Sequence, residues 1–141
     1  KDLMIVVGSP TKKGAAAGLS SYETVREITG DVAEKFGYSI FDIVDKKNRR
    51  ETPNVNSIRI VNHQQVRGLS ASHVIVLDLD LLENWCLDDQ ETHPPMRNLG
   101  YVSLSRSRAS TVVGFRNQLA NKTENFLSQS LEHYILKDIV K

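Results

Sequence analysis

Short apolar runs recur along the chain, separated by polar stretches that contain glycine, proline or asparagine. The runs are rich in Val and Ile, and each extends over only five to seven residues. Runs of this length are typical of strands that are buried on both faces of a parallel sheet. We therefore expect five strands, at 3–7, 39–44, 57–61, 73–79 and 111–115.

Apolar residues follow a helical spacing between the first two of these runs. A serine at position 20 or 21 can cap a helix that ends near Gly37. The face expected to pack on the sheet consists of Val25, Ile28, Val32, Ala33 and Phe36. Further helices are expected at 96–108, after two prolines, and at about 123–139. This alternation predicts one α/β domain over residues 1–141, with a mostly parallel central sheet.

Composition narrows the class of protein without naming a function. The chain has 141 residues, of which 40% are hydrophobic and 25% charged, the profile of a folded globular domain. The net charge of +1 makes no general demand for nucleic acid, so any basic function must come from local clusters. A single cysteine, Cys86, excludes an internal disulfide and a cysteine metal cluster, which favours an intracellular setting. No apolar run is long enough for a membrane span. The start at Lys1, without Met, suggests a piece of a longer protein.

Two stretches carry candidate chemistry for phosphate. The turn with Arg67 and Gly68 follows the run at 57–61, while Arg106 and Arg108 come just before the run at 111–115. Ligands of parallel α/β sheets bind beyond the carboxyl ends of the strands, and the planar arginine fork suits phosphate. On one helix the two downstream arginines would point about 200° apart, so only one could face a shared ligand.

The same stretches resemble a known pair of motifs. HQQVRGLSASHVIVLDL is similar to motif V of superfamily 1 helicases, and VSLSRSR, at 102–108, is similar to motif VI. Their order and approximate spacing also match that family. The resemblance implies a RecA-like three-layer fold, and specifically the second RecA-like domain of such a protein.

Residue roles follow from the resemblance. Arg106 matches the arginine that reaches the γ-phosphate of ATP and stabilises the transition state of phosphoryl transfer. Arg67, Gly68, Ser70 and Arg108 match positions around the nucleotide, Arg108 more as a support of the fold or of the interdomain contact. The residues implied near the nucleic-acid path are Asn62, His63, Gln64 and Gln65.

The resemblance also implies the partners. ATP and Mg²⁺ would be bound mainly by the first RecA-like domain of the same protein, because this chain lacks a P-loop: Gly14 is followed by Ala15. The other partner would be single-stranded nucleic acid, DNA or RNA. The histidines lack metal-ligand spacing, so no metal site is expected. Asp78 and Asp80 are expected only to end their strand in a polar way.

Two alternatives stay open. The family usually has glutamate where this chain has Ser70, which carries no charge. Together with the small net charge and the acidic stretch at 80–95, a possible protein-binding segment, this favours a degenerate helicase-like module that serves protein interaction or regulation. A stand-alone fold of the flavodoxin or receiver type is the third hypothesis, although no acidic triad follows the runs at 3–7 and 39–44.

Overall fold

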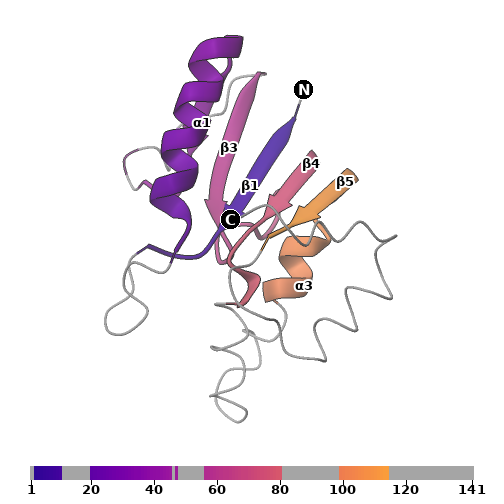
Figure 1. Cartoon of the computed structure of the whole chain (residues 1–141). Coiled ribbons are helices and arrows are strands. Elements are labelled where there is room, and N and C mark those ends of the chain that lie inside the picture. Colours follow the sequence, from indigo (N-terminus) through magenta and orange to yellow (C-terminus); the bar gives the residue numbers. More distant parts are fainter. Residues whose placement is uncertain (1, 11–19, 46, 48–55, 81–98, 115–141) are drawn as a thin grey trace.

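A computed structural model describes residues 2–10, 20–45, 47, 56–80 and 99–114. Within these residues, five parallel strands form one sheet in the order β2-β3-β1-β4-β5. The strands are β1 (Leu3–Val7), β2 (Ser39–Asp42), β3 (Ser57–Asn62), β4 (Ala71–Val76) and β5 (Ser107–Val113), and the helices are α1 (Tyr22–Phe36) and α3 (Leu99–Leu104) (Figure 1). The predicted α/β class and its mostly parallel sheet are confirmed.

Strand β1 is the centre of the sheet. It pairs with β3 on one side, from Leu3 opposite Ile58 to Val7 opposite Asn62, and with β4 on the other, where Leu3 lies opposite His73. The carboxyl ends of β1, β3 and β4 therefore lie next to one another (Figure 1). In open parallel sheets this edge, where connections leave in opposite directions, is the usual place for a ligand.

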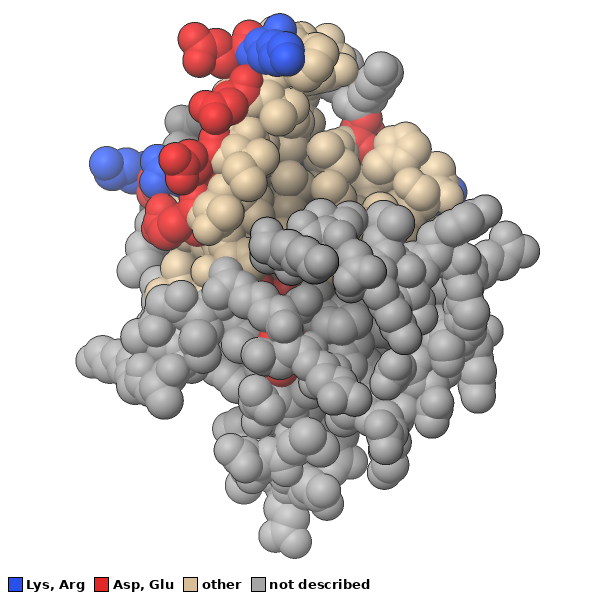
Figure 2. All heavy atoms as spheres, viewed as in Figure 1, with Lys and Arg blue, Asp and Glu red and all other residues tan. Residues whose placement is uncertain are grey.

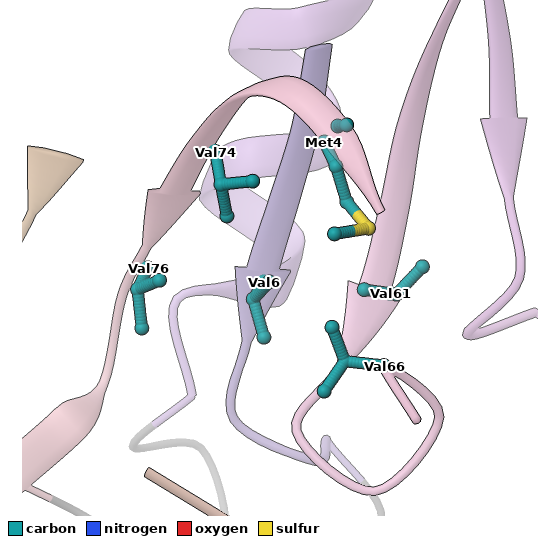
Figure 3. Packing of buried hydrophobic residues seen from close by; sticks show 7 residues of the cluster. Met4, Val6, Val61, Val66, Val74 and Val76 are labelled. Carbon is teal, nitrogen blue, oxygen red and sulfur yellow. The ribbon is translucent and has the colours of Figure 1, made fainter. Parts of the chain in front are cut away.

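Alternate residues of β1 build two buried clusters on opposite faces of the sheet. Met4 and Val6 belong to a cluster against which Val102 and Leu104, from α3, are packed. Figure 3 shows the strand residues of this cluster converging from β1, β3 and β4. On the other face, Ile5 and Val7 pack with residues of α1. The sheet is thus enclosed between two helical layers, as a three-layer fold requires.

The connection 63–70 runs from the carboxyl end of β3 to the amino end of β4. Because β1 lies between these two strands, this connection must pass over one face of the sheet. Val66, in the middle of the connection, is fully buried and joins the cluster with Met4, Val6 and Val61 (Figure 3). The burial of Val66 therefore holds the segment on the face of the sheet. In most parallel sheets a helix covers the face at such a connection.

The buried face of α1 differs from the predicted one. Tyr22, Val25, Thr29 and Ala33 are buried, whereas Ile28, Val32 and Phe36 are 58%, 39% and 63% exposed. The buried residues also follow helical spacing, but one of them, Thr29, is polar and was therefore not predicted to face the sheet. Sequence hydrophobicity alone therefore selected a face turned partly to solvent. The predicted end is right: Gly37 has a left-handed φ of 69° and donates its N–H to the Ala33 carbonyl.

The boundary between α3 and β5 corrects a second prediction. The expected helix at 96–108 ends in the structure at Leu104, and β5 begins at Ser107, earlier than the expected strand. Ser107 pairs with Ala71 of β4, and the Ala71 N–H donates to the Arg106 carbonyl at 3.1 Å. Pairing with β4 satisfies these backbone groups in extended form, so tertiary context overrides the local helical preference.

Other boundaries shift by a few residues. β2 ends at Asp42, because its carboxylate accepts the N–H groups of Val44 and Asp45 and turns the chain. The predicted helix at 123–139 and the acidic stretch at 81–95 lie outside the described residues. In the part of the chain that the structure describes, neither helix is long and apolar enough to cross a membrane.

The buried connection gives a first prediction. We expect Val66→Ala to lower the free energy of unfolding by about 2 kcal/mol, because it removes two methyl groups from a packed cluster. The neighbouring Arg67→Ala, at an exposed position, should stay within about 0.5 kcal/mol of the original chain. Urea unfolding followed by circular dichroism measures both. Equal effects of the two substitutions would mean that 63–70 is not held to the sheet by Val66.

Candidate functional site

The carboxyl edge of the sheet is organised by Asp78, which lies just beyond β4 and is 1% exposed. One of its carboxylate oxygens accepts the N–H of Gly8 and the N–H of Ser21, both at 2.8 Å. The other oxygen accepts the Ser21 hydroxyl at 2.5 Å. Asp78 therefore joins the end of β1 to the start of α1 and closes the loop between them at its base.

This position is where an α/β protein often binds an anion. N–H groups at the end of the first strand and the start of the following helix point towards such a ligand, and the helix dipole favours negative charge. In this chain the carboxylate of Asp78 supplies that charge from within the protein. The residue itself takes a left-handed φ of 58°, a conformation that aspartate tolerates better than most residues. The side chain of Asp78 thus occupies the position between β1 and α1 where an anion would bind.

Asp42 closes a neighbouring part of the same edge. Its carboxylate accepts the Tyr22 hydroxyl at 2.6 Å and two backbone N–H groups, while Arg26 lies 3.9 Å away. Burial and the hydrogen bond to Asp42 raise the pKa of Tyr22 above its ordinary value. The tyrosine consequently stays protonated and donates to the carboxylate at any ordinary pH.

His63 connects three segments from inside the fold. Its Nε2 lies 2.8 Å from the Leu77 carbonyl and its Nδ1 lies 2.9 Å from the Ser103 hydroxyl of α3. A carbonyl oxygen only accepts, so Nε2 carries the proton and Nδ1 accepts from Ser103. Burial lowers the pKa of His63 to about 4, although the Leu77 carbonyl and the charge of Asp78 act in the opposite direction. His63 is therefore neutral near pH 7 and holds the start of 63–70 against both β4 and α3.

Most of the other residues predicted near nucleic acid use their side chains in hydrogen bonds within and beside the turn that follows β3. The Asn62 side-chain oxygen accepts the N–H groups of Gln64 and Gln65, a polar turn at the strand end. The Gln65 side chain accepts from the Asn62 N–H and donates to the Ile43 carbonyl. Of the four predicted residues, Gln64 is the one with an exposed position, while Asn62 and His63 are buried.

Arg106 lies at the opposite edge of the sheet, in the turn between α3 and β5. Its Nε donates to the Val102 carbonyl at 2.8 Å and a terminal nitrogen donates to the Ser105 hydroxyl at 3.0 Å. Among the described residues no carboxylate forms an ion pair with it. Neutral oxygens therefore orient the guanidinium group without cancelling its positive charge.

Arg108 has a different environment although it is only two residues away. It extends from β5 to Asp2, whose carboxylate it meets at 2.8 Å, and the same carboxylate binds Arg59. Partial burial acts to raise the pKa of Asp2. Arg59, the Ser72 N–H and Arg108 outweigh that effect, so the pKa of Asp2 lies below its ordinary value. Arg108 thus helps to tie β5 to the start of β1.

The remaining predicted residues lie in the connection 63–70. Arg67, Gly68 and Ser70 are exposed, and the left-handed φ of 77° at Gly68 explains why glycine is required there. The Ser70 carbonyl accepts from Arg59 at the amino end of the sheet. The backbone conformation of Gly68 and the bond from Arg59 to the Ser70 carbonyl thus give these two residues roles in the fold.

The predicted site residues therefore fall into two groups instead of one. Asn62 to Gln65 stand at the carboxyl edge, whereas Ser70, Arg106 and Arg108 are gathered at the amino edge. The expectation that all these residues share the carboxyl edge is wrong for the second group. Arg106 comes directly before β5 and Arg108 lies near the start of β5, so both are at the amino edge. Sequence reasoning also gave Asp78 too small a role. An acid directly after a buried strand next to the central strand was the signal.

Within the described residues, no group of three or more His, Cys, Asp or Glu side chains is arranged to hold a metal ion. Comparison with protein-family models, with curated proteins and with solved structures finds no match.

Removing the Asp78 carboxylate should destabilise the fold. Asp78→Ala is expected to cost about 3 kcal/mol, since the buried Gly8 N–H and the partly buried N–H and hydroxyl of Ser21 lose this acceptor and alanine tolerates the left-handed φ poorly. Asp78→Asn should cost about half as much, because asparagine accepts the same φ and keeps one acceptor oxygen. Denaturant unfolding measures both, with exposed Asp31→Asn as the control. Unchanged stability in Asp78→Ala would contradict the bridging role.

The neutral state of His63 gives a pH dependence. The folded pKa of about 4 lies below the ordinary 6.5, so the unfolded chain binds more protons between these values. The contribution is complete above pH 6.5 and is lost as the pH falls towards 4. We expect a loss of about 2 kcal/mol between about pH 7 and about pH 5, measured by urea unfolding.

Two variants assign that loss. His63→Gln removes the titrating group, so its stability should depend much less on pH in this window. His73→Gln, at an exposed position of β4, should keep the dependence of the original chain. A slope that persists in His63→Gln would show that other groups cause it.

Proposed function

We propose that this chain is the second RecA-like domain of a superfamily 1 nucleic-acid helicase or translocase. In this proposal it does not hydrolyse ATP by itself. It supplies Arg106 to an ATP site that is held mainly by a first RecA-like domain, and it forms part of the track for single-stranded nucleic acid. The nucleotide and Mg²⁺ chemistry would belong to the partner domain, and either DNA or RNA is compatible with the residues.

The observation that carries the proposal is the meeting of the two motif stretches. Residues 63–70 and 102–108 are distant in sequence, yet the Ala71 N–H donates to the Arg106 carbonyl and Ser107 pairs with Ala71. The turn with Arg106 consequently lies beside the end of the other motif. Two motifs that act on one nucleotide must lie close together. This proximity therefore supports the proposal in addition to the sequence resemblance.

The environment of Arg106 also suits the proposed role. A finger arginine must keep its charge for a phosphoryl group and must be held in a fixed direction. Hydrogen bonds to the Val102 carbonyl and the Ser105 hydroxyl give Arg106 a direction without neutralising its charge. Arg108 differs, because the carboxylate of Asp2 already pairs with it. Of the two motif arginines, the structure therefore favours Arg106 for a ligand.

The position of the Asp78 carboxylate is compatible with a domain that acts on a nucleotide bound mainly by another domain. The end of β1 and the start of α1 would be the natural phosphate site of a nucleotide-binding domain. Here the Gly8 and Ser21 N–H groups are bonded to Asp78. A second negative group at this position would meet that carboxylate, so a phosphate is disfavoured. These residues are better suited to a domain that contributes an arginine to the ATP site than to a domain that itself binds the phosphates of ATP.

His63 offers a physical connection between the proposed track and Arg106. Gln64, exposed at the carboxyl edge, follows directly on His63, whose ring accepts from Ser103 of α3. The Ser103 carbonyl in turn accepts the Arg106 N–H at 3.4 Å. A change at Gln64 on binding a strand would thus reach the turn of Arg106 through directly bonded groups.

The experiment is the ATPase activity of the longer protein, with and without single-stranded DNA or RNA. Arg106→Ala should reduce stimulated turnover by about 10³-fold or more while ATP binding persists, because only transition-state charge stabilisation is lost. Arg106→Lys should recover little, since an ammonium lacks the planar fork. Arg108→Ala is the matched control and should retain most of the turnover, apart from a modest loss of stability.

Two outcomes would overturn the proposal. Turnover that is unaffected by Arg106→Ala would remove the finger role. Absence of nucleic-acid-stimulated turnover in the unmodified protein would favour the degenerate module instead, for which the uncharged Ser70 in the place of the family's glutamate is the supporting observation.

A further inference from the structure

One part of the sheet has no described helix over it. α1 lies against β2 and β3, whereas α3 lies against β4 from the opposite face. Within the described residues, this leaves the α1 side of β4 and β5, the open side, without a helix. Figure 1 shows α1 beside β3, with β4 and β5 further along the sheet. In Figure 2 the charged side chains gather along α1, and the visible surface beside it is mainly uncharged.

The carboxyl half of the open side is apolar. Ile75 of β4 packs partly against the cluster below α1, and Val112 lies opposite it in β5. Paired residues of neighbouring strands point to the same side, so Val112, which is 59% exposed, belongs to the open side. Leu77 lies beside the end of β5, because a Cβ added at Gly114 would meet its Cδ2 at 2.6 Å. Three apolar side chains thus lie together near the point where the chain leaves β5.

The amino half of the open side is polar. His73 of β4 lies opposite Ser110 of β5, with its Nδ1 at 2.8 Å from the serine hydroxyl, and both residues are exposed. A polar pair of this kind is well solvated, whereas exposed Val112 is not. Strands of parallel sheets are normally covered on both faces. The carboxyl half of the open side therefore requires an apolar cover.

The chain itself supplies a segment of suitable length at this place. β5 ends at the carboxyl edge of the sheet, and residues 115–141 follow in the sequence. The helix that the sequence predicts at about 123–139 would be about 25 Å long, close to the about 23 Å that the seven residues of β5 span. At 100° per residue its expected apolar positions fall within one half of the helix, namely Phe126, Leu127, Leu131, Tyr134 and Ile135.

The hand of the crossovers indicates the face that such a helix would take. The connection from β1 to β2 contains α1 and runs towards the β2 end of the sheet. The connection from β4 to β5 contains α3, on the opposite face, and runs towards the β5 end. Crossovers of one hand use one face for each direction. A helix that turns back from β5 over β4 therefore belongs on the α1 face, and α3 already occupies the other face of β4.

We propose that residues 123–139 form an amphipathic helix that returns antiparallel to β5 and covers the carboxyl half of the open side with its first turns. In this arrangement Leu127 and Leu131 shield Val112 from solvent. The packing does not depend on the proposed helicase role, since Val112 lies in the carboxyl half of β5 and Arg106 precedes its amino end. A second copy of the chain is the alternative occupant, and the experiment below separates the two.

The test measures how fast a maleimide labels a thiol at position 112 of the 141-residue chain. Val112→Cys is combined with Cys86→Ser, which removes the single native thiol. Arg67→Cys in the same background is the reference, because this exposed position belongs to the connection over the opposite face. Each rate is divided by the rate of the same chain unfolded in urea. We expect position 112 to be labelled at least about tenfold more slowly than position 67.

Paired substitutions in the predicted helix assign that protection. Leu127→Asp with Leu131→Asp should raise the labelling rate at position 112 at least about tenfold, because the charges resist burial on the open side. Gln129→Asp with His133→Asp, in the other half of the same helix, should leave the rate unchanged. If circular dichroism shows that the first pair prevents folding, Leu127→Ala with Leu131→Ala should give a smaller increase in the same direction.

Several outcomes would overturn the proposal. Equal labelling at positions 112 and 67, with the tail intact, would mean that the open side is uncovered. Equal effects of the two aspartate pairs would mean that Leu127 and Leu131 do not face it. Protection that is lost on dilution of the chain would make a second copy the occupant, and protection that persists in both leucine pairs would exclude this helix.

Discussion

The carboxylate of Asp78 is the interaction on which the described fold most depends. It lies beyond β4 yet accepts from Gly8, at the end of β1, and from Ser21, at the start of α1. One buried charge thus fixes two strand ends and a helix start, and three hydrogen bonds compensate its desolvation. The same arrangement places the Asp78 carboxylate at the carboxyl edge of the sheet, where a parallel sheet often binds an anion.

At that amino edge, neighbouring arginines have separate environments. Arg108 and Arg59 share the carboxylate of Asp2, which links β1, β3 and β5. Arg106 is oriented by a backbone carbonyl and a hydroxyl, so its charge is retained. The carboxylate of Asp2 thus neutralises Arg108, whereas among the described residues no carboxylate pairs with Arg106. His63 adds a buried neutral connection from the other edge to α3, made possible because burial keeps its ring unprotonated.

The two helices are held on the sheet in different ways. α3 is short and is held on the sheet through Val102, Leu104 and the bond from Ser103 to His63. α1 is longer, packs through Tyr22, Val25, Thr29 and Ala33 and leaves Ile28, Val32 and Phe36 exposed. The two helices lie on opposite faces of the sheet.

The sequence by itself determined the five strands of the described residues, the α/β class and the mostly parallel sheet, because strands buried on both faces must be apolar whatever they pair with. It also predicted the end of α1 at Gly37, which depends on a local property of glycine. Only the tertiary structure decided which side of α1 is buried, where β5 begins, and that Arg106 and Arg108 differ. Those features depend on groups distant in the chain: Asp78 and Gly8 are 70 residues apart, and β5 starts where β4 can pair with it. Local patterns carry no information about which distant hydrogen-bond partner the fold will supply.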